Sequence, residues 1–285
     1  MTKSLPVEAA LPALKRTLAD HRCAVLEAPT GAGKTTLVPL ALRDEAWAQG
    51  KKILMLEPRR VAARAAAARM ADLLGEKVGE TVGYRVRLDT RVGSATRIEV
   101  LTEALLTRRL QNDPALEGVA LVIFDEFHER SLNADLGLAL ALETQGALNE
   151  DLKILVMSAT LDGARVAKLL NEAPLVRSEG RLHPIETRYV PPRANTRVEQ
   201  AAAAAVLRAL EETDGGILAF LPGEGEIRNV ERQLSGEDLR GATLMPLYGA
   251  LSAEAQDRAI RPLPGGTRKI VLATAIAETS LTIED

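Results

Sequence analysis

The chain has 285 residues, more than one ordinary domain holds and about right for two. Its formal net charge of -3 excludes a protein that holds nucleic acid by overall positive charge, so a polyanion partner must be bound by local groups. Hydrophobic residues make up 46% but aromatic residues only 2%, so the cores must be built from Ala, Val, Leu and Ile, as in helices packed on parallel strands.

The single cysteine, Cys23, excludes an internal disulfide framework. None of the histidines, His21, His128 and His183, stands with it in the spacing of a zinc site. The N-terminal residues contain no apolar signal core, and no window approaches the roughly 20 apolar residues that a membrane span needs. We therefore expect a soluble monomer in the reducing cytoplasm, without a membrane partner.

In the first part of the chain, strand-like apolar runs alternate with helix-like runs, the pattern of a parallel sheet with crossover helices. Helices are predicted at residues 60–74 and 134–143. Buried strands are predicted at residues 23–28, 52–57, 97–102, 119–126 and 153–158.

A charged stretch with several prolines, residues 179–197, separates this part from a second alternation. The second set begins with an alanine-rich helix at 199–210 and continues with GILAFLPG, TLMPLYGAL and KIVLATA as strands. With three strands this sheet exposes an edge, so we expect it to be the less stable one. We predict a first lobe at 1–178, a crossing at 179–197 and an incomplete second lobe at 198–285.

The string APTGAGKTT follows the first predicted strand and opens a helix. Glycines let successive backbone N–H groups curl round phosphate oxygens, and the helix N-terminus adds a favourable partial charge. Lys34 can then reach the β and γ phosphates, and the Thr35 hydroxyl can ligate Mg²⁺. A glycine-rich turn without a ligand is the simpler alternative, but the strand, the helix and the GKT core together favour a phosphate loop. The predicted nucleotide-binding residues are Thr30, Gly31, Ala32, Gly33, Lys34, Thr35 and Thr36.

The usual G-x-x-x-x-G-K-T pattern begins with a glycine where this chain has Ala28. We expect that position to close the loop without touching phosphate.

The stretch LVIFDEFHERSL, residues 121–132, ends an apolar strand in two acids. A strand that surfaces into a charged turn is the plain alternative. A phosphate loop that hydrolyses a nucleotide, however, needs an acid on a neighbouring strand for Mg²⁺ and a group that positions water. We expect Asp125 to hold Mg²⁺ with its water shell, together with Thr35, and Glu126 to orient the attacking water.

Six arginines gather within residues 85–109. On charge alone, a solvated surface is the simpler interpretation, although a local polyanion site is the alternative. These residues are Arg85, Arg87, Arg91, Arg97, Arg108 and Arg109.

Seven strings occur in one order: the phosphate loop, LEPRR, TEALL, DEFHER, SAT, FLPG and TAIAETSLTI. The series resembles the motifs of superfamily 2 helicases of the DEAH-box group. The DEFH spelling, APTGAGKTT and YRVRLDT are most similar to the bacterial HrpB-type DEAH-box ATP-dependent helicases. The resemblance covers nearly the whole chain and implies an α/β fold of two RecA-like lobes, with parallel sheets flanked by helices, ATP in the cleft and single-stranded nucleic acid across both.

The resemblance also implies roles for single residues. His128 would couple the ATP site to the second lobe, and Arg69 would stack on adenine; an incidental surface histidine and a solvated helix face are the alternatives. The sugar-phosphate backbone would be gripped by Arg59, Arg60, Thr102 and Thr274, which gives salt-sensitive binding. Hydrolysis would be coupled to strand separation by Ser158, Thr160, Glu278 and Thr279; helix capping is the alternative for Ser158 and Thr160.

Two departures from the family pattern stand out. Ala275 replaces the asparagine of TNIAET, and no Q-R-x-G-R-x-G-R string exists in the sequence. The arginines of that string neutralise charge on the transferring phosphate, a contribution of about 10³ to 10⁵ in rate. Arg261 and Arg268 stand in no matching context. We therefore predict the N-terminal part of a longer helicase that binds nucleotide and hydrolyses it poorly.

The predicted function is an ATP-dependent helicase that uses ATP and Mg²⁺ on single-stranded nucleic acid, RNA by resemblance to its relatives. Backbone grips alone do not distinguish RNA from DNA. One alternative is a P-loop ATPase that does not unwind, such as a transporter subunit, although QLSGED at residues 233–238 is a poor match to LSGGQ. The other is a module that binds ATP and single strands without processing either.

Overall fold

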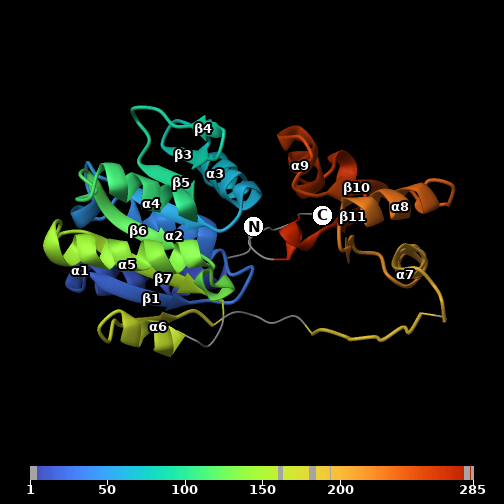
Figure 1. Cartoon of the computed structure of the whole chain (residues 1–285), viewed down its shortest axis with the longest axis horizontal. Coiled ribbons are helices and arrows are strands. Elements are labelled where there is room, and N and C mark those ends of the chain that lie inside the picture. Colours follow the sequence, from blue (N-terminus) through green and yellow to red (C-terminus); the bar gives the residue numbers. More distant parts are fainter. Residues whose placement is uncertain (1–4, 160–162, 180–183, 193, 279–282, 284–285) are drawn as a thin grey trace. The chain divides into compact units, whose positions relative to one another are not determined.

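The computed structural model describes residues 5–159, 163–179, 184–192, 194–278 and 283. The chain divides into two compact units, residues 1–182 and 183–285 (Figure 1). Each unit has parallel strands flanked by helices, so the predicted α/β class is confirmed.

The first unit is built on an eight-stranded sheet in the order β4-β3-β5-β2-β6-β7-β1-β8. All neighbouring strands are parallel except β3 and β4, which form an antiparallel pair. The central strands are buried on both faces, which is why they are continuous apolar runs in the sequence. The strands are β1 Cys23–Glu27, β2 Lys52–Glu57, β3 Val82–Val86, β4 Asp89–Arg91, β5 Ile98–Thr102, β6 Val119–Phe124, β7 Lys153–Ser158 and β8 Leu175–Arg177.

Helices cover both faces of this sheet because strand side chains alternate between two apolar clusters. Ile53 and Met55 face one cluster, whereas Leu54 and Leu56 face the other. The first face is covered by α1 Leu11–Asp20, α2 Lys34–Leu42 and α3 Arg60–Leu74. The second is covered by α4 Glu103–Asn112, α5 Leu132–Ala147 and α6 Gly163–Leu169, with α4 and α5 side by side (Figure 1). Short 3-10 turns lie at η1 Pro6–Ala9, η2 Ala46–Ala48 and η3 Phe127–Glu129.

Several element boundaries differ from the sequence prediction. The strand predicted at 119–126 ends at Phe124, because Glu126 adopts a left-handed backbone that no strand can continue. The helix predicted at 134–143 is longer and begins at Leu132, where the Ser131 hydroxyl accepts the Ala134 N–H at 2.9 Å. The β3–β4 hairpin and β8 were missed because β4 and β8 have only three residues each and the apolar run of β3 is interrupted by Gly83 and Arg85.

The second unit has three parallel strands in the order β10-β11-β9. Side chains of the edge strand β9 alternate: Ile217 and Ala219 pack on the cluster beneath the helices, while Leu218 and Phe220 are 40% and 52% exposed. Residues 184–192 contain no helix or strand. The elements are α7 Val198–Glu212, β9 Ile217–Phe220, α8 Glu224–Leu234, β10 Thr243–Leu247, α9 Ala253–Ile260, η4 Pro264–Gly266, β11 Lys269–Ala273 and η5 Ala275–Ala277.

Within the described residues, no helix has both the length and the apolar character that crossing a bilayer requires.

Because the second unit has a smaller core and an uncovered strand face, we expect it to unfold first in urea. Ile227 and Leu18 are both fully buried, one in each unit. Ile227→Ala should lower the unfolding free energy of the first transition by about 2–5 kcal/mol and leave the second in place. Leu18→Ala should lower the unfolding free energy of the second transition and leave the first in place. Far-UV circular dichroism during urea titration measures both; one transition displaced by both substitutions would contradict independent units.

Candidate active site

The phosphate loop lies between the end of β1 and the start of α2. Gly31 and Gly33 have φ of 75° and 87°, a left-handed conformation that side chains rarely adopt. Gly33 is also the N-cap of α2, and a Cβ there would lie 2.7 Å from Leu5 Cδ1. Both glycines are therefore required by the backbone, which places the N-terminus of α2 at the carboxyl edge of the sheet, where an anion is favoured.

The remaining loop residues anchor it or face solvent. Ala28 is buried and its N–H donates to the Ser158 carbonyl at 3.0 Å, while the Ala32 carbonyl accepts the Val7 N–H at 3.1 Å. Thr30 is exposed. The Thr36 hydroxyl lies 3.5 Å from the Gly33 carbonyl.

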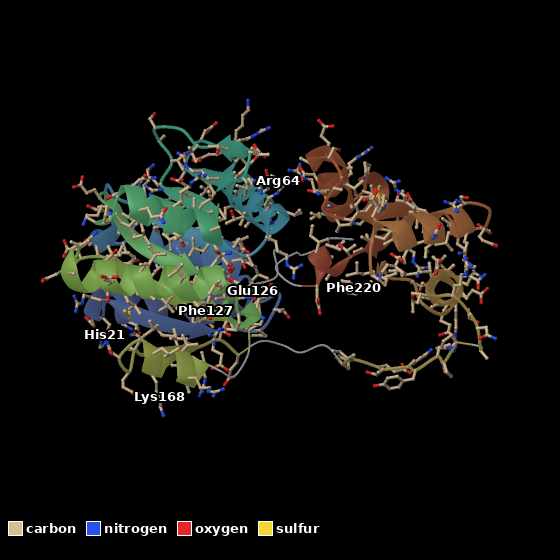
Figure 2. The ribbon with its side chains drawn as sticks, in the orientation of Figure 1. His21, Arg64, Glu126, Phe127, Lys168 and Phe220 are labelled. Carbon is tan, nitrogen blue, oxygen red and sulfur yellow. The ribbon has the colours of Figure 1, made fainter. Side chains whose placement is uncertain are left out.

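Two side-chain contacts connect this loop to the acids after β6. Lys34 Nζ donates to Glu126 Oε1 at 2.7 Å, and both side chains are almost fully buried. Thr35 Oγ1 donates to Asp125 Oδ2 at 2.5 Å. β6 and β1 are separated only by β7, so the sheet brings together residues about 90 positions apart. Figure 2 labels Glu126 next to Phe127 in the first unit.

The backbone turns sharply between the two acids. Glu126 has φ 48° and ψ 34°, and its N–H donates to Asp125 Oδ1 at 2.8 Å. In a continuing strand, successive side chains would point to opposite faces of the sheet. The left-handed residue, which costs about 1–3 kcal/mol, instead turns both carboxylates toward the phosphate loop.

The charges in this cluster shift one another. Burial lowers the pKa of Lys34, but the carboxylates of Asp125 and Glu126 outweigh it, so the net shift is upward and the ammonium stays charged. Burial, and then Asp125, raise the pKa of Glu126 against the opposing effect of Lys34. Glu126 Oε2 is buried and receives no hydrogen bond from the described residues. This oxygen is therefore available to accept a proton.

Glu57 was not predicted from the sequence, although it belongs to LEPRR. It ends β2, is fully buried, and neither carboxylate oxygen receives a hydrogen bond from any described donor. Burial raises its pKa well above the ordinary value, and the charges of Asp125 and Glu126 raise it further. With a proton retained, Glu57 would carry no negative charge and could donate a hydrogen bond to Asp125. Only the strand order, with β2 next to β6, reveals this third carboxyl.

His128 links the carboxylates to the segment after β7. The Ala159 N–H donates to His128 Nδ1 at 3.4 Å, and the same nitrogen lies 3.4 Å from Glu126 Oε2. Burial, and then the charge of Lys34, lower the pKa of His128, so the ring is neutral and its contact with Glu126 is not an ion pair. Ser158 is a buried strand residue, not a helix cap. Thr160 lies outside the described residues.

Three of the predicted nucleic-acid contacts lie near one another in the first unit. Thr102 ends β5 directly opposite Glu57 of β2, and it is the N-cap of α4. Arg59 and Arg60 follow β2 and begin α3. Arg60 is exposed, whereas Arg59 already pairs with Glu129 of DEFHER at 3.3 Å. The sheet thus gathers these side chains at neighbouring strand ends.

The remaining predicted residues are dispersed. Arg69 is exposed on α3 of the first unit. Thr274 follows β11 and Glu278 is exposed in the second unit, while Thr279 lies outside the described residues.

Arg268, considered as a substitute for the missing arginines, instead braces the second unit. Its guanidinium donates to the Gly215 carbonyl at 2.7 Å, the Leu210 carbonyl at 3.2 Å and the Thr213 hydroxyl at 2.9 Å. Its role here is structural.

Comparison with known proteins agrees with this geometry. A family model described as DEAD/DEAH box helicase matches residues 8–169. The chain is 55% identical to the ATP-dependent RNA helicase HrpB of Escherichia coli K12, over 99% of this chain and 35% of the relative. It is 36% identical to the ATP-dependent RNA helicase HrpA homolog of Haemophilus influenzae, over 99% of this chain and 22% of that protein.

Solved structures give the same result. The crystal structure of the Escherichia coli DEAH/RHA helicase HrpB matches with a TM-score of 0.91 at 55% identity, covering 99% of this chain and 36% of that chain. The chain thus spans about a third of the length of these HrpB relatives. The resemblance to HrpB-type DEAH-box helicases is confirmed, and the chain belongs to the DEAD/DEAH box helicase family.

Proposed function

We propose that this chain binds ATP with Mg²⁺ at the phosphate loop and is the ATP-binding part of an ATP-dependent RNA helicase. The observation that carries the proposal is the convergence of Lys34 and Thr35 with Glu126 and Asp125. A buried lysine, a hydroxyl and two carboxylates at a helix N-terminus are the groups that nucleotide hydrolysis needs.

The residues present fit both ligands. The Thr35 hydroxyl and the Asp125 carboxylate are hard oxygen ligands, which Mg²⁺ prefers, and they already lie in contact. The left-handed glycines and the N-terminus of α2 form a cradle for phosphate oxygens. When bound, Mg²⁺ would neutralise charge on the phosphates. Lys34 would exchange part of its contact with Glu126 for a phosphate oxygen.

In this proposal Glu126 orients the attacking water. Its unpaired Oε2 is the acceptor, and its raised pKa makes it a better base than an exposed glutamate. His128 Nδ1 lies 3.4 Å from that oxygen and accepts the Ala159 N–H, so a displacement of the segment after β7 would alter the environment of Glu126. This contact supports a role of His128 in coupling hydrolysis to movement, and the same role is proposed for Ser158 and Thr160, which flank Ala159 in the sequence.

The nucleic-acid partner is proposed to be single-stranded RNA, since the relatives are named ATP-dependent RNA helicases. Arg60 and Thr102 would contact the sugar-phosphate backbone, with Arg59 joining once it leaves Glu129. Thr274, Glu278 and Thr279 of the second unit would complete the contacts of a chain that acts as a monomer. Arg69 would contact adenine.

We expect the 285-residue chain to hydrolyse ATP close to background, with or without single-stranded RNA. The sequence lacks Q-R-x-G-R-x-G-R, and Arg268 is engaged within its own unit, so no arginine is assigned to the transferring phosphate. That loss is worth about 10³ to 10⁵ in rate. Steady-state phosphate release, with Lys34→Ala as control, measures it. A strong RNA-stimulated rate that depends on Lys34 would contradict the expectation and point to Arg261.

We expect Mg²⁺ to tighten nucleotide binding through Thr35. Thr35→Ala should reduce the gain in affinity on adding Mg²⁺ by about tenfold, because a lost hydrogen bond to a charged group costs at least about 1.5 kcal/mol. Thr35→Ser keeps the hydroxyl and should restore the gain. Fluorescent ADP titrated with Mg²⁺ or with chelator gives the ratio. If Mg²⁺ raises the affinity for ADP equally in Thr35→Ala and wild type, Thr35 is not a ligand of Mg²⁺.

We expect Glu57→Gln to stabilise the first unit more as pH rises. The folded protein holds a proton on Glu57 that the unfolded chain releases above its ordinary pKa of 4.5. Wild-type stability from this group is therefore complete below pH 4.5 and lost above it, by up to about 1.4 kcal/mol per pH unit. Glutamine is neutral throughout and avoids the loss.

Urea unfolding of the first unit in chelator, from pH 5 to 8, tests this expectation. The exposed Glu117→Gln is the matched control, with less than about 0.5 kcal/mol of change at any pH. A wild-type advantage that grows with pH would show that Glu57 is charged in the folded protein.

A further inference from the structure

A second cationic site lies in the first unit, in the angle between α4 and the strands β3 and β5. It is a hollow of about 370 Å³, called the α4 hollow below. Its α4 wall carries Leu105, Arg108, Arg109 and Asn112, whose spacing of three and four residues places them on one helix face. The volume falls within the range of small-ligand sites, about 300–1,000 Å³.

The floor of the α4 hollow is a buried carboxylate. Glu99 of β5 is 0% exposed, and three cations point at it. Its Oε1 accepts Arg85 Nε at 2.5 Å, and its Oε2 lies 3.3 Å from Arg109 Nη1 and 3.7 Å from Lys52 Nζ. One carboxylate thus fixes three long side chains in one place, which lowers the entropy that a ligand must remove.

The charge in the α4 hollow is opposite in sign to that of the whole chain. Four cationic side chains against Glu99 leave a net charge of +3, while the complete sequence carries -3. Arg108 is exposed and forms no ion pair with any described residue. By contrast, Arg97 is occupied by the carbonyls of Lys51 and Ala48 at 2.9 and 2.8 Å. Within the arginine cluster, Arg97 is therefore structural, Arg85 and Arg109 are held by Glu99, and Arg108 is available to a ligand.

The α4 hollow is separate from the phosphate loop. β5 and β1 are four strand spacings apart in the sheet, roughly 19 Å at about 4.8 Å per spacing. Lys52 and Glu99 also lie near the amino ends of their strands, whereas the phosphate loop follows the carboxyl end of β1.

We propose that the α4 hollow is a second phosphate-binding site, which takes a phosphoryl group from a free nucleotide or from the backbone of an RNA strand. The Glu99 carboxylate contacts the guanidinium groups of Arg85 and Arg109 and neutralises one of the four positive charges. The remaining charge of +3 suits a multiply charged anion. Arginine presents a planar set of donors that matches phosphate oxygens. Leu101 and Leu105 offer an apolar surface to a sugar or base.

The stoichiometry of ADP binding in equilibrium dialysis tests the free-nucleotide source. The expected result is two equivalents for wild type, and one each for Arg108→Glu and Lys34→Ala, because each substitution removes a different site. Arg108→Lys should restore the second equivalent. Arg16→Glu is the matched control, since Arg16 is exposed on α1, which covers the opposite face of the sheet.

A labelled single-stranded RNA tests the strand source by fluorescence anisotropy at several salt concentrations. If RNA fills the site, wild type binds one ADP, and Arg108→Glu weakens RNA binding several-fold. The slope of log affinity against log salt concentration should then decrease in magnitude by about one, as expected for the loss of one phosphate contact. Either pattern supports the phosphate site, and the two patterns identify its source.

The proposal is overturned if Arg108→Glu behaves like Arg16→Glu in both experiments, or if an acidic peptide binds through Arg108 while ADP and RNA do not. Circular dichroism melting confirms that the variants fold, which is expected because Arg108 is exposed. Neither ADP stoichiometry nor RNA anisotropy depends on ATP hydrolysis. A chain that does not hydrolyse ATP can therefore still support or overturn the phosphate site in the α4 hollow.

Discussion

The buried contact between Lys34 and Glu126 is the interaction on which the site depends. It joins the phosphate loop after β1 to the acids after β6 across the intervening β7. Removing one partner of such a pair typically costs about 3–5 kcal/mol, because the other charge is left buried. The loop glycines and the turn at Glu126 both accommodate this contact. The side chains of Lys34, Thr35, Asp125 and Glu126 are therefore already in contact in this structure.

Much of the fold could be predicted from the sequence, because parallel strands buried on both faces are continuous apolar runs. The strands at residues 52–57 and 153–158 and the helix at 60–74 have the predicted bounds. The β3–β4 hairpin could not be found this way, since its turn is set by Leu88 at φ 67° in a charged stretch. The end of β6 was misplaced for a related reason: periodicity contains no information on a single left-handed residue such as Glu126.

The candidate site shows the same limit for side chains. Motif spacing assigned roles to Lys34, Asp125 and Glu126, because the order of loop and strand restricts what they can reach. Glu57 was missed, since its importance comes from the adjacency of β2 and β6. The arginine cluster could not be interpreted from the sequence for the same reason. The pairing of β3 with β5, which sets Gly83 opposite Glu99, determines which cations contact the Glu99 carboxylate.

The support behind the phosphate loop comes from the start of the chain. Leu5 lies against Gly33, and the Val7 N–H donates to the Ala32 carbonyl. These two residues ahead of α1 therefore pack against the loop and support it. Substitutions at Leu5 or Val7 would therefore act on the phosphate loop without changing any residue of the GKT core.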